Sequence, residues 1–392
     1  MIVLSAHRLY TPREEIRDPL LFIEDGLISA VSSGAEREIP RHATLIDLAQ
    51  EGLADAILAP GFVDIHMHGG AGVDVMRAAS TELPHLNKFL TTHGVTGYFA
   101  TTVTAPLDQT CSALECLADA IESPQTSPGN GDAVQARPLG IHLEGPFLSH
   151  KRRGVHPPEY LVEPTLAVFE RLWQAARGHV RMMTIAPELP GALEVIAEAA
   201  RRKVCVSLGH SDAVLETARA GVRAGARHAT HTFNAMRPLD HRDPGIVAEV
   251  LTDPQLTADM IVDGIHVAPE VVQIFLRMMG LERAVLITDA TSAAGMPDGI
   301  YHLGPIEVVV KDGKCTNNGN LAGSVLTMDQ AVRNVTRFSG WSLQHAVRAA
   351  TLNPALATGL TQHGTLSPGA EANIVVLDSK GVVKKTMVRG RI

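Results

Sequence analysis

Histidines and carboxylates at the ends of apolar, strand-like runs are the residues of this sequence best suited to chemistry. His66 and His68 close the first such run. Because side chains alternate along a strand, residues two apart share a face, and both imidazoles can reach one ion. Later runs end in the same way at Glu144, His210, His231 and Asp289. Nitrogen and oxygen donors without a thiolate suit zinc, iron or a similar divalent ion.

Each of these residues also has an ordinary structural explanation. A lone His-x-His is often a turn or a solvent-facing pair, and His231 could be a core histidine whose hydrogen bonds are satisfied. Glu144, His210 and Asp289 could each belong to a loop or to the cap of a following helix. Their joint placement at the ends of successive strand-like runs favours a shared metal centre over these separate explanations.

The elements that must position these residues alternate between strands and helices. Helical patterns such as Leu189–Arg202 and Ala213–Ala224 separate apolar β-type runs, which predicts parallel βα units. Eight such runs predict an α/β fold of the (β/α)8, or TIM barrel, type, in which catalysis sits at the carboxyl ends of the strands. The expected strands are Phe62–His66, Gly97–Val103, Leu139–Leu143, Val180–Ile185, Val204–Leu208, His228–His231, Thr257–Val262 and Val285–Thr288.

Both chain ends predict a second, smaller unit made of strands. At about 150 residues per domain, 392 residues already favour one large domain and one small one. Leu20–Glu24 and Leu27–Val31 flank an Asp-Gly turn and predict a hairpin, and Ala372–Asp378 and Val382–Val388 look similar. We expect one β-sandwich from residues 1–57 and 356–392, with the barrel at 58–355 inserted. Residues 123–131 are expected to be a surface loop.

Charge and composition exclude several classes of function. Lys and Arg number 34 and Asp and Glu 42, for a formal net charge of −8, whereas nucleic-acid binding needs a basic face. Aromatic residues make up 4% of the chain, which is thin for stacking bases. No apolar run reaches the roughly 18 residues that a membrane helix needs. We therefore expect no nucleic-acid partner and no membrane association.

The chain termini and the cysteines bear on the compartment. Charged residues interrupt the first 18 positions, where a signal peptide needs an apolar stretch. The 4 cysteines form no Cys-x-x-Cys pair, and Cys111 and Cys116 have the spacing of two turns of one helix. These features predict a cytoplasmic protein with reduced thiols.

Longer motifs add a family resemblance that covers nearly the whole chain. PGFVDIHMHG at residues 60–69 resembles the opening motif of the amidohydrolase superfamily, and TLSPGAEANIVVLD at 365–378 is similar to its return into the small β-domain. A further series occurs in the order seen in N-acetylglucosamine-6-phosphate deacetylases. The series is HLEGPF (142–147), GVHP (154–157), GHSDA (209–213), THTFNAM (230–236), DGIHV (263–267), TDAT (288–291) and LAGS (321–324).

The resemblance implies roles for the residues at the strand ends. Glu144, His210 and His231 would hold the principal metal ion, and Asp289 would be the general base and acid. We expect a divalent ion, zinc first, with iron, cobalt and manganese as alternatives because nitrogen and oxygen ligands accept all four.

A second ion is expected from His66 and His68. Some family members carry Gln and Asn at these two positions and use one metal ion, whereas this sequence keeps both histidines. Superfamily relatives often bridge two ions with a carboxylated lysine on the fourth strand, but residues 180–188 contain no lysine. Glu144 is then the expected bridge, with one or two ions per subunit.

The implied reaction is hydrolysis of an N-acetyl amino sugar phosphate, with glucosamine 6-phosphate and acetate as products. By the same resemblance, His156 would donate a hydrogen bond to the tetrahedral oxyanion. Because the chain is acidic, the phosphate needs local positive charge, for which Arg242 and His266 are the candidates and Arg237 is a rival. Other candidate substrate contacts are Val155, Asn234, Ala235, Asp263, Gly264, Ile265, Leu321, Ala322 and Gly323.

Several alternatives stay open at this point. The galactosamine epimer would need the same chemistry, and another amidohydrolase or a non-catalytic scaffold could share the fold. His142 could lie beside the metal ligands or be a buried histidine satisfied by barrel carbonyls. Members of this family have an active site near a two-fold interface, so a homodimer is expected, with Arg242 acting in its own subunit or in the partner.

Overall fold

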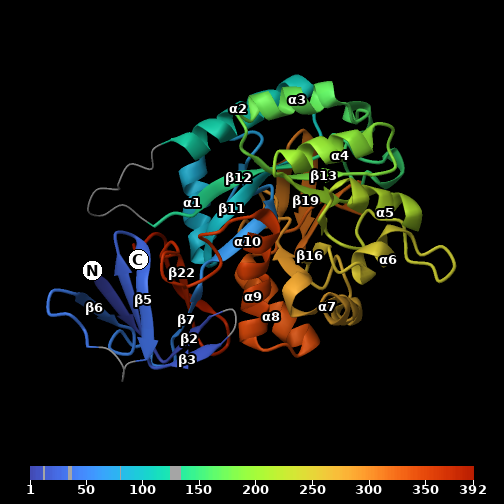
Figure 1. Cartoon of the computed structure of the whole chain (residues 1–392). Coiled ribbons are helices and arrows are strands. Elements are labelled where there is room, and N and C mark those ends of the chain that lie inside the picture. Colours follow the sequence, from blue (N-terminus) through green and yellow to red (C-terminus); the bar gives the residue numbers. More distant parts are fainter. Residues whose placement is uncertain (12–13, 34–37, 80, 124–133) are drawn as a thin grey trace.

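The computed structural model describes residues 1–11, 14–33, 38–79, 81–123 and 134–392. The loop predicted at 123–131 lies, apart from Ser123, outside these residues. Within the described chain, a ring of parallel strands forms the centre of the larger body, and helices lie around its outside (Figure 1). None of the described helices has the length and apolar character needed to cross a membrane.

The larger body is the predicted barrel. Its sheet has 8 strands in the order β17-β16-β15-β14-β13-β12-β11-β8, and neighbours are parallel throughout. The ring closes where the Asp289 backbone N–H donates to the His66 carbonyl at 2.9 Å. The strands are β8 (Phe62–Met67), β11 (Val95–Thr102), β12 (Arg137–Glu144), β13 (Val180–Ile185), β14 (Cys205–Leu208), β15 (His228–Ala229), β16 (Thr257–Ile261) and β17 (Ala284–Ile287).

The helices turn an apolar stripe toward this barrel. In α4 (Ala192–Arg201) the buried residues Ala192, Val195, Ile196 and Ala199 recur at helical spacing. α3 (Leu166–Ala175) begins at Thr165, whose side chain accepts from the Val168 N–H and caps the helix. The remaining helices are α1 (Leu83–Thr92), α2 (Leu107–Glu122), α5 (Leu215–Ala224), α6 (Gly245–Thr252), α7 (Pro269–Arg283), α8 (Met328–Ser339), α9 (Leu343–Ala349) and α10 (Leu352–Thr358), with 3-10 turns at His150–Arg152 and Pro158–Tyr160.

Strands from both chain ends build the predicted β-sandwich. One sheet has the order β5-β4-β1-β6 and the other β23-β22-β7-β2-β3, so red and blue strands lie side by side in Figure 1. Leu4, Leu21, Leu58 and Ile374 belong to the core between them. The strands are β1 (Ile2–Ser5), β2 (Arg8–Tyr10), β3 (Glu15–Arg17), β4 (Pro19–Glu24), β5 (Leu27–Ser33), β6 (Thr44–Asp47), β7 (Ile57–Pro60), β22 (Ile374–Leu377) and β23 (Val383–Met387).

The hairpin expected around Asp25-Gly26 is confirmed by the antiparallel pairing of β4 with β5. The proposed domain limits stay predictions. The limit at residues 57/58 falls inside β7, and the limit at 355/356 falls inside α10. α2 carries both Cys111 and Cys116, and all four cysteines are free.

An antiparallel sheet that the sequence reasoning did not anticipate follows the last barrel strand. It comprises β18 (Gly299–Leu303), β19 (Ile306–Lys311), β20 (Lys314–Asn317) and β21 (Asn320–Leu321). Alternate residues of β19 are buried, so Val308 and Val310 pack with Met76 and Val103. Beside this sheet lies a short pair, β9 (Gly69–Gly70) and β10 (Val73–Asp74), directly after the first strand. The two additions are joined where the Gly304 N–H donates to Asp74 Oδ2 at 2.6 Å.

Candidate metal centre and active site

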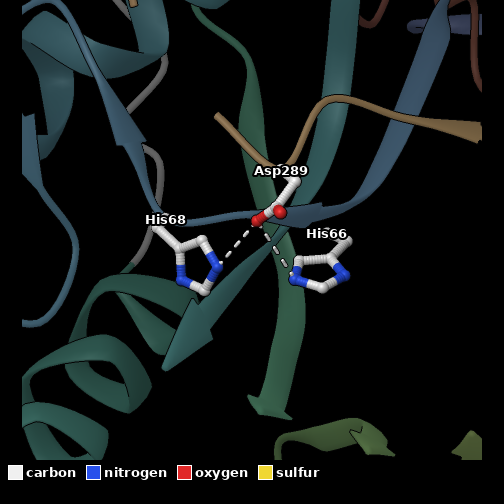
Figure 2. Close-up of side chains that lie close together, drawn as sticks. All are labelled: His66, His68 and Asp289. Carbon is white, nitrogen blue, oxygen red and sulfur yellow. Dashed lines mark ion pairs between the residues drawn. The ribbon is translucent and has the colours of Figure 1, made fainter. Parts of the chain in front are cut away.

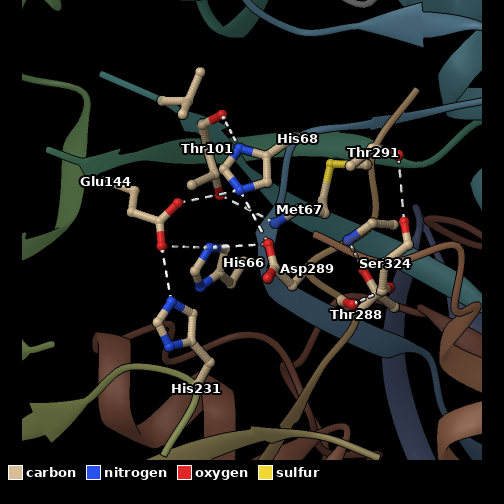
Figure 3. A network of polar contacts seen from close by, with 12 residues as sticks. His66, Met67, His68, Thr101, Glu144, His231, Thr288, Asp289, Thr291 and Ser324 are labelled. Carbon is tan, nitrogen blue, oxygen red and sulfur yellow. Dashed lines mark hydrogen bonds and ion pairs between the residues drawn. The ribbon is translucent and has the colours of Figure 1, made fainter. Parts of the chain in front are cut away.

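The six candidate residues from the strand ends converge at the carboxyl end of the barrel. Their ligand atoms form two groups, and within each group the atoms lie within 4.8 Å of one another. All six side chains are buried. One group is His66, His68 and Asp289 (Figure 2), and the other is Glu144, His210 and His231 (Figure 3 draws Glu144 and His231).

The backbone turns sharply at three of these residues. His210, His231 and Asp289 are each the second residue after a barrel strand, and their φ angles are 47°, 28° and 50°. The left-handed region is rarely adopted by residues other than glycine, and it is concentrated at functional sites. Here the turn directs each side chain inward over the barrel mouth, where a continuing strand would have carried it away.

Glu144 lies between the two groups and contacts both. Its Oε1 is 3.1 Å from His231 Nε2, 3.3 Å from His210 Nε2 and 3.4 Å from His66 Nε2. Its Oε2 is 3.2 Å from His68 Nε2. One carboxylate therefore faces nitrogen donors from both groups (Figure 3), which is the arrangement a bridging ligand requires.

Asp289 faces the His66 and His68 side of the centre. Its Oδ1 lies 3.0 Å from His68 Nε2 and 3.5 Å from His66 Nε2 (Figure 2). The carboxylate of Asp64 binds the residue that precedes Asp289. Asp64 accepts from the Thr288 hydroxyl at 2.6 Å and from the Thr288 N–H at 3.4 Å, directly before Asp289.

The donor atoms of the centre fit a metal ion. The Nδ1–H groups of His68 and His210 donate to the carbonyls of Thr101 (3.0 Å) and Arg152 (2.9 Å), so the free lone pair of each ring is at Nε2, which faces the centre. His210 Nε2 and His231 Nε2 lie 3.1 Å apart, close enough for an N–H···N hydrogen bond or for both nitrogens to bind one cation.

A second observation agrees with this fit. Among the described residues, neither ring nitrogen of the buried His66 makes a hydrogen bond, and His231 Nδ1 also has none. Buried polar atoms are nearly always partnered, so the unpartnered His66 nitrogens point to a ligand outside the polypeptide. With carboxylate and imidazole donors and no thiolate, the residues present suit a divalent ion.

The electrostatics of the centre favour ionised carboxylates. Burial alone would raise the pKa of Glu144, but the surrounding imidazoles, led by His66, hold it well below its ordinary value. Burial also opposes ionisation of Asp289, yet His66 and His68 lower its pKa. Conversely, burial lowers the pKa of His68, but hydrogen bonds to Asp289 and Glu144 outweigh it and raise the pKa to about 10. The carboxylates and imidazoles of the site thus form one buried cluster in which each stabilises the charge of the other.

His156 presents a hydrogen-bond donor to the same centre. The Thr104 backbone N–H donates to His156 Nδ1 at 3.2 Å, so this nitrogen is an acceptor. Burial, together with the neighbouring His210, lowers the pKa of His156 to about 3, so the ring is neutral and its proton sits on Nε2. That Nε2 lies 3.7 Å from Glu144 Oε2.

The loop after β15 carries two of the predicted phosphate contacts. Asn234 and Ala235 lie three and four residues after His231, and the Asn234 N–H donates to the His231 carbonyl at 2.9 Å. The Asn234 Nδ2 is buried and has no hydrogen-bond partner among the described residues. The Ala235 carbonyl accepts from Ser211 N–H at 3.1 Å, which ties this loop to the residue after His210.

The segment 263–266 folds around one carboxylate. Asp263 Oδ1 accepts from the N–H groups of Ile265 and His266, both at 2.8 Å, and Oδ2 accepts from His266 Nδ1–H at 2.7 Å. Gly264 has φ 79°, where a side chain would be strained. The carboxylate therefore fixes the ring of His266 and leaves its Nε2 available.

The structure separates the two candidate arginines. Arg237 pairs with Asp212 at 3.3 Å and with Asp243. Arg242 is exposed, and its guanidinium forms no ion pair with any residue in the described ranges. Only Arg242 therefore has a free cation, and the structure does not bring its side chain to the buried centre.

The remaining predicted contacts lie beside Asp289 or at the rim. Gly323 leaves no room for a side chain, because a Cβ would lie 2.9 Å from the Asp289 carbonyl oxygen. Ala322 is buried in a small hydrophobic cluster, and the partly buried Val155 packs against that cluster. Leu321 and Ile265 are each 37% exposed, as expected of residues at an opening.

Several residues that support the centre were not predicted from the sequence. For one more, His142, the sequence left two explanations open. Thr104 and Thr288 were not singled out, nor was Asp64, although it precedes His66 by two positions and so shares its strand face. Burial raises the pKa of Asp64 to about 6. His142 packs edge-on against His66, with ring centroids 4.5 Å apart. Threonine hydroxyls rather than carbonyls satisfy it, the Thr184 Oγ1 at 2.8 Å from Nε2.

Comparisons with known proteins agree with this geometry. The amidohydrolase family model matches residues 57–392. An N-acetylglucosamine-6-phosphate deacetylase from Lysinibacillus sphaericus is 37% identical over 97% of this chain and 94% of its own. An N-acetylgalactosamine-6-phosphate deacetylase from Escherichia coli O157:H7 is 38% identical over 100% and 98%.

A solved structure extends the likeness to three dimensions. A mutant N-acetyl-D-glucosamine-6-phosphate deacetylase from Mycobacterium smegmatis, in complex with N-acetyl-D-glucosamine-6-phosphate, matches with a TM-score of 0.90 and 36% identity. The match covers 100% of this chain and 98% of that one. With a family model over most of its length and full-length relatives above 30% identity, this chain belongs to the amidohydrolase family.

Proposed function

We propose that this protein is a metal-dependent hydrolase that removes the acetyl group of N-acetyl-D-glucosamine 6-phosphate, giving D-glucosamine 6-phosphate and acetate. The observation that carries the proposal is the position of Glu144 between two groups of ligand atoms, with Asp289 completing one of them. Two of the three relatives described above bear the glucosamine name, one of them with that substrate bound, so we place the galactosamine epimer second.

The proposed metal ligands are Glu144, His210 and His231 for one ion, with His66 and His68 for a second. A divalent ion bound there would polarise the acetyl carbonyl and lower the pKa of water from 15.7 toward about 7. We propose zinc first, with iron, cobalt and manganese accepted by the same donors.

Asp289 is the proposed general base and acid. Its pKa is lowered, so the carboxylate is ionised and can accept the proton of the attacking water. The same group then delivers that proton to the departing amine nitrogen. Such proton transfer typically contributes about 10²–10⁴-fold to the rate. The neutral His156, with its proton on Nε2, donates to the oxyanion that forms at the acetyl carbonyl oxygen when water adds to the carbonyl carbon.

The substrate's phosphate is proposed to lie near Asn234, Ala235 and His266, with Arg242 as its arginine. The unpartnered Asn234 Nδ2, the fixed ring of His266 and the unpaired guanidinium support this set. Two parallel N–H groups of an arginine guanidinium can donate to two phosphate oxygens at once. The sugar is proposed to contact Val155, residues 263–266 and residues 321–323, mainly through the backbone.

We also propose a homodimer, in which Arg242 contacts the phosphate in its own subunit's site or in the partner's. The exposed, unpaired side chain of Arg242 is free to do either. Partner contributions are tested by mixing subunits, as described below.

Turnover of both epimers on one metal-analysed sample tests the function. We expect deacetylation of N-acetylglucosamine 6-phosphate to exceed that of the galactosamine epimer, with at least one divalent ion per chain. Chelation should abolish activity, and added zinc should restore it. Activity that survives complete metal removal would contradict the mechanism, and faster turnover of the galactosamine epimer would reverse the order of substrates.

A further inference from the structure

The backbone of His231 needs a restraint that the metal-ligand geometry alone does not provide. Its φ of 28° is left-handed, and a β-type conformation would be the ordinary continuation of β15. Residues in such conformations persist only where their surroundings hold them. The contacts of His231's own main chain therefore indicate what holds this proposed ligand in place.

Asp259 makes those contacts. It lies on β16, the strand next to β15, and it is fully buried. Its Oδ1 accepts from the backbone N–H of His231, and its carbonyl accepts from the Thr232 N–H at 2.9 Å. One residue thus binds two successive N–H groups at the turn. None of these contacts involves the ring of His231, whose Nε2 is left to face Glu144.

A second histidine orients the carboxylate of Asp259. His228, also fully buried, donates from Nε2 to Asp259 Oδ2 at 2.9 Å. Its Nδ1 lies 2.6 Å from the Thr257 hydroxyl, which in turn donates to the Arg227 carbonyl at 3.2 Å. Both oxygens of the carboxylate are thereby occupied, and the chain of contacts ends at the strand start, away from the candidate active site.

We propose that Asp259 is a positioning residue of the metal centre. Its carboxylate, held by His228, fixes the left-handed backbone of His231, so that His231 Nε2 stays 3.1 Å from both Glu144 Oε1 and His210 Nε2. This inference rests on the proposed function, because it assumes that His231 is a metal ligand. The competing explanation is that Asp259 and His228 are simply a buried polar pair that stabilises the barrel.

Zinc affinity of the full-length protein, measured by competition with a chelator, tests the proposal without using activity. We expect Asp259→Ala to weaken the tighter zinc site roughly 10–100-fold, as removal of groups that orient metal ligands typically does. Asp259→Asn keeps an acceptor for the His231 N–H and should stay within about threefold of wild type. Ser207→Ala is the matched control: Ser207 is equally buried in the barrel, and its hydroxyl bonds to that of Thr230.

A double variant separates positioning from stability, and it also covers the case in which Asp259→Ala does not fold. Asp259→Val/His228→Leu replaces the buried polar pair with apolar side chains of similar size, an exchange that often preserves or improves stability. It still removes the acceptor for His231. We expect a thermal midpoint close to that of wild type, weakened zinc binding, and an altered visible spectrum after cobalt substitution.

The outcomes are distinct. Zinc affinity of the double variant within about twofold of wild type would overturn the positioning role. An equal loss in Ser207→Ala would overturn it too, since any disturbance of the barrel would then suffice. Wild-type protein that binds no zinc, cobalt, iron or manganese would remove the proposed metal centre itself, and this inference with it. Loss confined to the Asp259 variants, with rescue by Asn, is the result we expect.

Discussion

The backbone N–H of Thr104 donates to Nδ1 of His156 and thereby places the proton of that ring on Nε2, on the side of Glu144. A neutral imidazole that is held in one tautomer is a fixed donor, which needs no rearrangement when charge develops on a substrate oxygen.

Replacement of His156 tests this donor. We expect His156→Phe to lower kcat about 10²–10³-fold, the usual effect of removing one oxyanion donor, with a small change in KM. Steady-state kinetics on N-acetylglucosamine 6-phosphate measure both constants. Thr104→Val keeps the backbone N–H and should have a much weaker effect. If His156→Phe retains kcat within twofold, the ring has another role.

Replacement of Asp289 tests the proton transfer. Asp289→Asn preserves the shape of the side chain but removes its basicity, so turnover should fall by about 10²–10⁴-fold. The principal ion, held by Glu144, His210 and His231, should remain bound, and metal analysis of the same sample checks this. An Asn variant with near-normal turnover would exclude Asp289 as the base.

Two arginine variants test the phosphate contact. Arg242→Ala should raise KM for the phosphorylated sugar roughly 10–100-fold, as loss of a charged hydrogen bond does, while leaving kcat/KM for unphosphorylated N-acetylglucosamine nearly unchanged. Arg237→Ala is the matched control because Arg237 is already paired with Asp212 and Asp243. A larger KM effect from Arg237→Ala would exchange the two assignments.

Mixed dimers test whether Arg242 acts across an interface. Neither Arg242→Ala nor Asp289→Asn subunits alone are expected to work well. If Arg242 serves the partner's site, a mixed dimer holds one site with both an intact Asp289 and an intact arginine, and activity should reappear on mixing. No recovery in verified mixed dimers would place Arg242 in its own subunit's site.

Acid should weaken a contact between α8 and His93, the residue that follows α1. Burial opposes ionisation of Asp329, but His93 (3.0 Å), Thr327 and Arg333 (2.7 Å) lower its pKa to about 2. Because the pKa is below its ordinary value of 3.8, this contribution is complete above about pH 4 and is lost as pH falls toward 2. It amounts to roughly 2 kcal/mol at neutral pH.

Denaturant unfolding between pH 7 and pH 2.5 measures this loss. Asp329→Asn should be less stable than wild type at neutral pH, with the difference shrinking below pH 4. Asp108→Asn, at a carboxylate that is 93% exposed and pairs with Arg171, should show little difference at any pH. A constant gap between Asp329→Asn and wild type at every pH would assign the effect to packing.

The fold was predictable where a strand is a mainly apolar run. Val180–Ile185 was predicted with the limits that β13 has, because parallel strands covered on both faces are rich in apolar residues; within it only Arg181 is exposed. The run His228–His231 was predicted as a strand, but β15 ends at Ala229, since the left-handed turn that directs His231 inward also ends the pairing. The sheet at residues 299–321 was missed, although the alternating burial of β19 has a period of two.

The candidate site was predictable as far as residue type and strand end could locate it. The residues that support the candidate site were not predictable, because each makes a hydrogen bond that joins a side chain to a backbone N–H far away in the sequence. Asp259 lies 28 positions from His231 and meets its N–H, and Thr104 lies 52 positions from His156. Such contacts leave no local pattern, and only the folded chain brings the partners together.

The strand order of the small domain also affects how the protein is made. β22, built from residues close to the end of the chain, lies between β23 and the early strand β7. While the chain is being synthesised, the edge of β7 stays without its neighbour until the whole barrel has emerged, and unpaired edges are the places where chains associate wrongly. The last strands thus complete the sheet that contains β7. Chains truncated before β22 should therefore aggregate even when every residue of the barrel is present.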